Sequence, residues 1–225
     1  MGDQELIQEI VGLSKVYYNR QWMFATAGNL SIRSVTNPSQ IWITASGKDK
    51  GNLNQTDFVC VDILTSEIVK NSLQPLPNES DSPLHNATKN KPSAETSIHQ
   101  AVYQFSSTIS AVLHVHTLSS NLLVYSVSSQ EKFKLVDIPN IEIIKAYGIW
   151  NENPNLKMAV FYNFGNVKDI AESIQLFFAE NPDYMLPFIL VEGHGPTVWG
   201  NSILEANRHL EATAFLFDVM KESLR

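Results

Sequence analysis

The sequence contains only one cysteine, Cys60, among its 225 residues. No internal disulfide can form, which is typical of proteins from a reducing compartment. Long hydrophobic runs are also missing, since the longest, YMLPFILV (184–191), is far shorter than a bilayer span and contains Pro187. The first ten residues, MGDQELIQEI, lack the basic start and apolar core of a signal peptide. We therefore expect a cytoplasmic protein.

Positive charge is scarce as well. The chain has 16 basic against 23 acidic residues, a net charge of −7, and no run of Lys or Arg. This balance disfavours nucleic acid and anionic membranes as partners. A small anionic substrate would have to be held by a local arrangement, because the overall field repels it.

The apolar pattern alternates between helical and strand periods along the whole chain. We find no internal repeat and no linker, so we predict one α/β domain over residues 1–225. Expected helices cover 4–20, 93–105, 167–180 and 202–224, and expected strands cover 31–35, 40–46, 57–63, 111–116 and 188–193. Residues 71–93 are rich in Pro, Asn and Ser and are interpreted as a long irregular connection, which in compact domains is usually functional or mobile.

Two histidines, His114 and His116, stand one residue apart at the end of an apolar run. If residues 111–116 form a strand, both rings point to the same face, roughly 7 Å apart along the strand. They could then share one metal ion. The alternative is a pair of core or surface histidines that hydrogen bonds satisfy.

A third histidine, His194, lies between two glycines just after another apolar strand. The flanking glycines allow close backbone approach, although an ordinary turn histidine would look the same. Three neutral imidazoles with one open position are typical of a catalytic zinc. His85 and His209 are interpreted as surface or structural, and His99 stays open because it shares a helix face with Glu95.

Three small polar segments could bind an anion: TAGNLSIR (26–33), ITASGKDKG (43–51) and KPSAE (91–95), of which two contain lysine. A helix expected to begin at Ser93 would present unpaired N–H groups. The other residues of these segments that could bind the anion are Gly28, Asn29, Ser46, Gly47 and Lys91. Each segment alone is a common turn, so the hypothesis requires that they converge.

Two carboxylates are candidates for acid/base work. Glu95 lies at the expected helix start, between the polar segments and the histidine strand. Glu142 has Ile141 and Ile143 as neighbours, from which we expect partial burial and a raised pKa, although a lone acid on an apolar stretch can also face solvent.

The segments TAGNLSIR, ITASGKDKGNL, KPSAETSIHQAVYQ, AVLHVHT and GHGPTVWG occur in the order found in the class II aldolase/adducin family, which the chain resembles over nearly its whole length. The resemblance implies a three-layer α/β/α domain with a largely antiparallel central sheet. It also implies a homotetramer with sites at subunit interfaces and a small phosphorylated ketose as substrate. One Zn²⁺ per subunit would be held by the positions matching His114, His116 and His194, and phosphate by those matching Gly28, Asn29, Ser46, Gly47 and Ser93.

Within that family, KPSAET, EIIKAYGIW and HGPTVWG are most similar to members that dehydrate 5-methylthioribulose 1-phosphate to 2,3-diketo-5-methylthiopentyl 1-phosphate in methionine salvage. The position matching Glu95 is the acid/base of the aldolases, whereas Glu142 matches a glutamate of the dehydratases. We predict that Glu142 carries the principal acid/base role and that Glu95 assists beside the zinc.

Two positions depart from the family pattern. Ala94 stands where the aldolases usually carry a second serine, and Pro196 follows GHG where an apolar residue is common. The missing serine disfavours the first alternative, a sugar-phosphate aldolase or epimerase. The second alternative is a non-catalytic adducin-like interaction module, which the retention of all three histidines disfavours.

Overall fold

The computed structural model describes residues 2–69 and 90–223, so His85 and most of the predicted connection at 71–93 lie outside the described residues. The helices are α1 (Asp3–Asn19), η1 (Lys50–Asn52), η2 (Gln55–Asp57), α2 (Thr96–Phe105), α3 (Leu118–Leu122), η3 (Glu142–Tyr147), α4 (Val167–Glu180) and α5 (Ile203–Ser223). The strands are β1 (Asn29–Arg33), β2 (Gln40–Thr44), β3 (Phe58–Asp62), β4 (Ala111–His114), β5 (Phe133–Asp137), β6 (Lys157–Phe161), β7 (Phe188–Val191) and β8 (Gly195–Gly200).

One eight-stranded sheet runs through the described part of the chain, in the order β3-β2-β1-β4-β8-β7-β6-β5. β6 and β7 pair in parallel, and the other neighbouring strands pair antiparallel. The parallel pair arises because α4 connects β6 to β7, and a parallel connection needs such a crossover. The α/β class is thus confirmed, with a sheet that is mixed.

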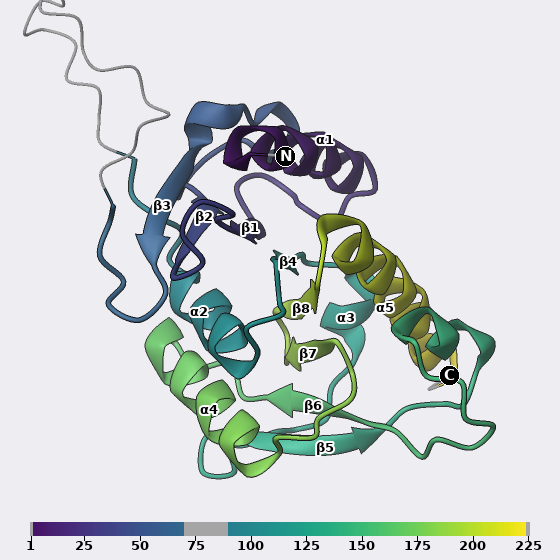
Figure 1. The fold of residues 1–225 in the computed structure, drawn as a ribbon. Helices are drawn as coiled ribbons and strands as arrows, with labels where there is room; N and C mark the ends of the chain where they lie inside the picture. The colour runs from purple at the N-terminus through teal and green to yellow at the C-terminus, as the bar shows by residue number, and fades with distance from the viewer. Residues whose placement is uncertain (1, 70–89, 224–225) are drawn as a thin grey trace, which may run out of the picture.

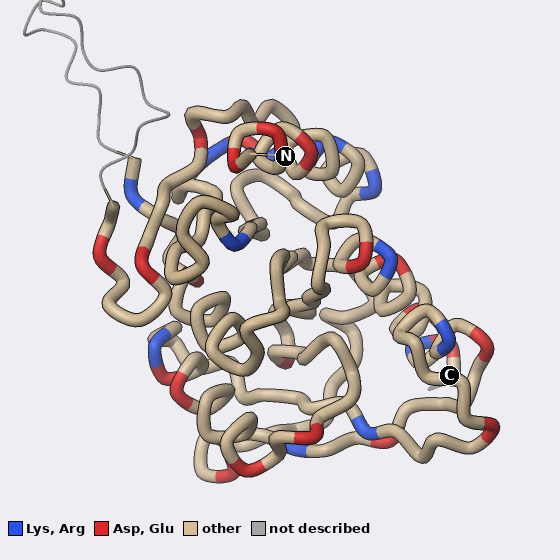
Figure 2. The backbone as a smooth tube through the Cα atoms, viewed as in Figure 1, with Lys and Arg blue, Asp and Glu red and all other residues tan. Residues whose placement is uncertain are grey.

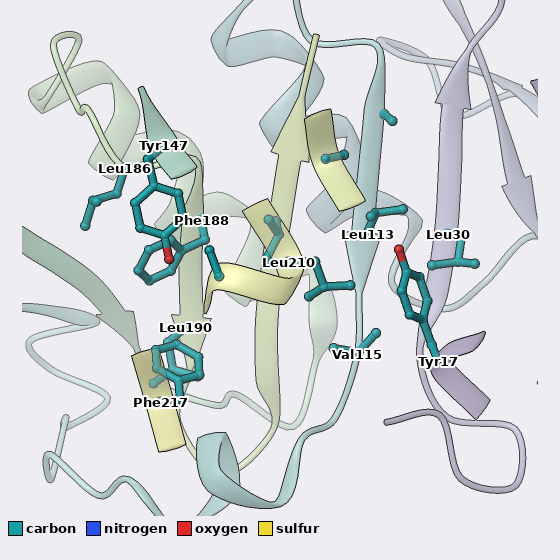
Figure 3. Packing of buried hydrophobic residues seen from close by; sticks show 14 of the residues in the cluster. Tyr17, Leu30, Leu113, Val115, Tyr147, Leu186, Phe188, Leu190, Leu210 and Phe217 are labelled. Carbon is teal, nitrogen blue, oxygen red and sulfur yellow. The ribbon is translucent and has the colours of Figure 1, made fainter. Parts of the chain in front are cut away.

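Helices cover both faces of the sheet. α1, α3 and α5 lie on one side, and α2 and α4 lie on the other (Figure 1). On the α1/α5 side, Tyr17, Leu30, Leu113, Phe188 and Leu210 belong to one buried cluster (Figure 3). Burying such side chains stabilises the fold by about 1.5–3 kcal/mol each.

The opposite face is apolar except near one end of β1. Ile98 and Val102 of α2 pack with Phe177 of α4 and with the sheet. Because side chains alternate along β1, Leu30 and Ile32 enter the α1/α5 cluster, whereas Asn29 and Ser31 point toward α2. A short polar strip is therefore buried beneath α2.

The expected amphipathic helices are confirmed at both ends of the chain and at residues 167–180. Ser93 as the helix N-cap is wrong, because α2 begins at Thr96 with Glu95 at its N-cap. The backbone N–H of Ser93 instead donates to Thr44 of β2, which holds Ser93 in a turn ahead of the helix. β5 was missed by the sequence analysis, and β6 and β8 are not among the expected strands.

Basic and acidic residues are interspersed along the backbone of the described residues (Figure 2). Among the described residues, no helix has the length and apolarity needed to cross a bilayer.

The ends of β4 and β8 approach each other closely at Gly195. A Cβ atom at this position would collide with the carbonyl oxygen of Val115 and crowd the Cα atom of His116. Only glycine leaves room for this approach, which sets the spacing between the histidine segment and the β7–β8 turn.

Replacing Gly195 by Ala is expected to lower the free energy of unfolding by about 1–3 kcal/mol, because the new methyl group must push β8 away from β4. Gly12→Ala is the matched control. It lies on α1, where a Cβ meets nothing within 4 Å, and alanine there should stabilise the helix by about 0.5–1 kcal/mol. Thermal unfolding followed by circular dichroism compares the two, and a Gly195→Ala protein as stable as its parent would contradict the close approach.

Candidate metal centre and surrounding site

Three histidine rings and one carboxylate converge at the end of β4. The Nε2 atom of His114 lies 2.8 Å from Nε2 of His116 and 3.1 Å from Oε2 of Glu95. The Nε2 atom of His194 lies 3.1 Å from the other oxygen of Glu95. All four candidate ligand atoms lie within 4.8 Å of one another.

The outer nitrogen of His114 determines which of its ring atoms faces the cluster. Nδ1 lies 2.9 Å from the carbonyl oxygen of Pro196, so this nitrogen carries the proton and donates it. Nε2 is then left with a lone pair that faces the cluster. Such a contact on the far ring nitrogen is typical of metal-bound histidines.

These atoms fit a divalent cation. The Nε2 lone pair of His114 faces a carboxylate oxygen of Glu95 at 3.1 Å, and two acceptors this close repel each other unless a positive charge lies between them. Burial lowers the pKa of His114 to about 4 and that of His116 to about 3, so protonation does not supply this charge near neutral pH. Ligand atoms held about 2.0–2.1 Å from tetrahedral zinc lie about 3.3 Å apart, which falls within the observed range.

Backbone contacts hold the other two histidines. The strand expected over 111–116 ends at His114, so His116 lies beyond it, where its N–H donates to the carbonyl of Trp22. His194 sits in the β7–β8 turn after Gly193, which has φ +63°. The side chain of Asn121 donates to the backbone carbonyl of His194.

Glu95 is held at the N-terminus of α2. Its Oε2 accepts a hydrogen bond of 2.9 Å from the side-chain amide of Asn29, at the start of β1. Burial alone would raise the pKa of this carboxyl, but the hydrogen bonds with His194 and with the Asn29 amide hold that pKa well below its usual range. The carboxylate therefore faces the histidines as an anion.

Two of the polar segments lie side by side. The N–H of Ser46 donates to the carbonyl of Lys91 at 2.9 Å, and Ala45 forms an isolated bridge with Pro92. Ser93 follows in the next turn, close to the start of α2. The side chain of Lys91 is exposed.

The third segment reaches the same region through Gly28 and Asn29. Gly28 has φ +77°, and a Cβ there would crowd Met23 and the carbonyl of His114. Gly47 also has a positive φ, +73°, in a turn with open space around it. The three polar segments therefore lie next to one another, and Asn29 connects them to Glu95. That they bind phosphate stays a prediction.

Lys50 was missed by the sequence analysis. Its side chain is buried, and Nζ donates to the carbonyls of Thr26 and Lys48 at 2.9 Å and 3.1 Å. Burial lowers the pKa of this amine, and the nearby Glu95 opposes the shift. Lys50 joins two of the polar segments, but a lysine in a Gly- and Asp-containing loop carries no sequence signal for burial.

The expected burial of Glu142 is wrong for the chain by itself. Its side chain is 84% exposed and pairs with Lys145 within η3. Tyr147 of η3 packs on Phe188 at the start of β7, the end of that strand away from His194. Within the described residues, no hydrogen bond or ion pair joins Glu142 to the histidines.

Comparison with known proteins identifies the family. The model of the family described as class II aldolase and adducin N-terminal domain matches residues 8–220. Methylthioribulose-1-phosphate dehydratase of Leptospira biflexa is 52% identical over 214 residues, covering 95% of this chain and 95% of that protein.

Solved structures share the fold. YgbL of Klebsiella pneumoniae is similar with a TM-score of 0.72 at 21% identity, over 97% of this chain and 89% of that chain. An L-fuculose 1-phosphate aldolase is similar with a TM-score of 0.70 at 20% identity, over 97% of this chain and 86% of that chain. The chain belongs to the class II aldolase and adducin family.

Proposed function

We propose that this chain is a zinc-dependent lyase that dehydrates 5-methylthioribulose 1-phosphate to 2,3-diketo-5-methylthiopentyl 1-phosphate in methionine salvage. The observation that carries the proposal is the cluster of three imidazoles and Glu95 beside the converging polar segments. The high identity to a dehydratase over almost the full length of both proteins supports the choice of substrate.

His114, His116 and His194 would hold the zinc. When bound, zinc would supply Lewis-acid polarisation of the ketose oxygens and so make the proton on C3 more acidic. Glu95, which faces these histidines as an anion, would stand next to the polarised oxygens and assist proton transfer.

The substrate phosphate would be held by backbone and side-chain donors of Gly28, Asn29, Ser46, Gly47 and Ser93, with Lys91 at the rim. This binding does no chemistry itself. It positions C3 against the base and excludes misaligned poses. This orientation raises the rate because the reacting groups are already aligned.

The dehydration requires one base and one acid. A proton leaves C3, the C4–O bond breaks, and the departing hydroxyl takes a proton to leave as water. The resulting enol then becomes the second ketone as C4 gains a proton. We assign the principal acid/base role to Glu142 and the assisting role to Glu95.

Because η3 packs near the far end of β7, we propose that Glu142 enters the site of a neighbouring subunit in a homotetramer. Leu118 and Leu122, one turn apart on α3 just after His116, are exposed apolar side chains that an adjacent subunit would cover. We also propose that residues 1–225 form a single domain and that the protein is cytoplasmic.

The direct test is an assay of the purified protein on methylthioribulose 1-phosphate. We expect formation of the diketone, followed by its ultraviolet absorbance and by mass spectrometry, at a rate that exceeds any carbon–carbon cleavage. Release of dihydroxyacetone phosphate from ordinary ketose 1-phosphates at a higher rate would favour the aldolase alternative.

Metal content tests the histidine assignment. Wild type is expected to contain about one zinc per chain by elemental analysis, because three neutral imidazoles with an open position are typical of catalytic zinc. His116→Ala should lose it, whereas the control His209→Gln, on α5 with its Nδ1 bonded to Trp199, should keep it. Active wild type free of any divalent metal would contradict the site, and one equivalent of another divalent ion would change the metal only.

The Glu142 assignment is tested by Glu142→Gln, which should reduce kcat by about 10²–10⁴ while zinc content persists, because the amide cannot transfer the proton. The control is Glu172→Gln, an exposed glutamate of α4, which should retain full activity. Near-normal turnover in Glu142→Gln together with an inactive Glu95→Gln would reverse the two roles.

Mixing subunits tests where Glu142 acts. Inactive Glu142→Gln and Glu95→Gln chains, denatured together and refolded, should regain activity, because roughly a quarter of interfacial sites would then combine both native glutamates. Separately refolded mixtures should stay inactive. No recovery in co-refolded tetramers would place both glutamates in one subunit.

A further inference from the structure

A stripe of polar side chains along α2 faces the polar strip of β1. Glu95, His99 and Tyr103 are spaced four residues apart on the helix, and Asn29 and Ser31 are two residues apart on the strand. Four helical residues rise about 6 Å, close to the roughly 6.6 Å of two strand residues. Asn29 therefore lies between Glu95 and His99, and Ser31 lies one step further on, between His99 and Tyr103.

The five side chains form one continuous line of hydrogen bonds. The hydroxyl groups of Tyr103 and Ser31 lie 2.9 Å apart, and Ser31 Oγ lies 2.7 Å from Nδ1 of His99. Nε2 of His99 contacts Oδ1 of Asn29, and the amide nitrogen of Asn29 donates to Glu95 at 2.9 Å. His99 and Ser31 are fully buried.

The end of the line at Glu95 fixes the direction of every bond in it. The amide nitrogen of Asn29 donates to Glu95, so the amide oxygen of Asn29 faces Nε2 of His99. His99 must then carry its proton on Nε2 and accept at Nδ1 from Ser31. Burial lowers the pKa of His99 to about 4, against the opposing effect of Glu95, so the ring is neutral with one donor and one acceptor.

We propose that His99 is a positioning residue that locks the amide of Asn29, so that both amide hydrogens point into the site. One hydrogen bonds Glu95, and the other is presented to an anionic oxygen of the substrate. This inference rests on the proposed function only for the identity of that substrate, because the donor it creates serves any phosphate.

A purely structural role would not require this line. Buried polar groups are costly unless satisfied, and replacing a bonded pair by apolar groups of similar shape is often neutral for stability. Without the proton on Nε2 of His99, the Asn29 amide could turn over, and its oxygen would then face Glu95 and repel a phosphate. The line therefore selects donor over acceptor at this position.

The test measures binding of inorganic phosphate to the metal-loaded protein by calorimetry. His99→Leu removes the donor to Asn29, and we expect phosphate to bind about ten- to a hundredfold more weakly, with metal content unchanged. His99→Gln, whose amide nitrogen can replace Nε2, should bind within about threefold of wild type. If the site needed only an apolar side chain at this position, the Leu variant would bind phosphate at least as well as the Gln variant.

A double-mutant cycle guards against a general loss of structure. Asn29→Ala should weaken phosphate binding by itself, and adding His99→Leu to it should cause no further loss, because His99 acts through Asn29. Additive losses, an unchanged affinity in His99→Leu, or no phosphate binding by the metal-loaded wild type would each overturn the inference.

The dehydration assay separates this inference from the proposed function. Phosphate affinities in the expected pattern with no diketone formed would refute the function and leave the positioning role intact. Diketone formation together with wild-type phosphate affinity in His99→Leu would support the proposed function and refute the positioning role.

Discussion

The meeting of four electron-rich atoms at the end of β4 is the constraint on which the rest of the structure depends. Three imidazole nitrogens and a carboxylate lie within 4.8 Å of one another, an arrangement that a divalent cation would stabilise. The fold holds them there by features with no other evident use: the glycine that lets β8 approach β4, and the Pro196 carbonyl that fixes the His114 proton.

The second organising feature is the register between α2 and β1. Because Glu95 stands at the N-cap of α2, the helix places a carboxylate beside the three histidines at one end and covers buried polar groups along its length. Its apolar residues meanwhile pack on the sheet and on α4. The same helix thus packs on the hydrophobic core and positions Glu95. A shift of α2 would alter both the packing and the position of this carboxylate.

Of the two glutamates in the proposed mechanism, only Glu95 lies at the histidine cluster within a single chain. Glu95 is in place, whereas Glu142 is exposed on η3 and anchored through Tyr147 to the start of β7. Leu118 and Leu122 of α3, which follows His116, are also exposed and apolar. An assembly that covers these surfaces would also exclude water from the metal, which strengthens every electrostatic interaction there.

The sequence by itself determined what depends on local pattern and residue chemistry. Helical spacing placed α1, α4 and α5, and the three histidines with their neighbouring glycines indicated a metal site because imidazole is a specific ligand type. The order of the polar segments indicated the family. These predictions hold because each depends only on neighbouring residues or on the chemistry of a single side chain.

Only the tertiary structure decided which of these groups meet. Ser93 was expected to begin a helix, but pairing with β2 made Glu95 the N-cap. Lys50 is buried although its loop reads as solvent-exposed, His99 is joined to Glu95 through a strand about seventy residues away, and Glu142 is exposed although its neighbours are isoleucines. Each outcome depends on which strand lies beside which and on what covers it, and the packing of distant segments, rather than any local period, sets both.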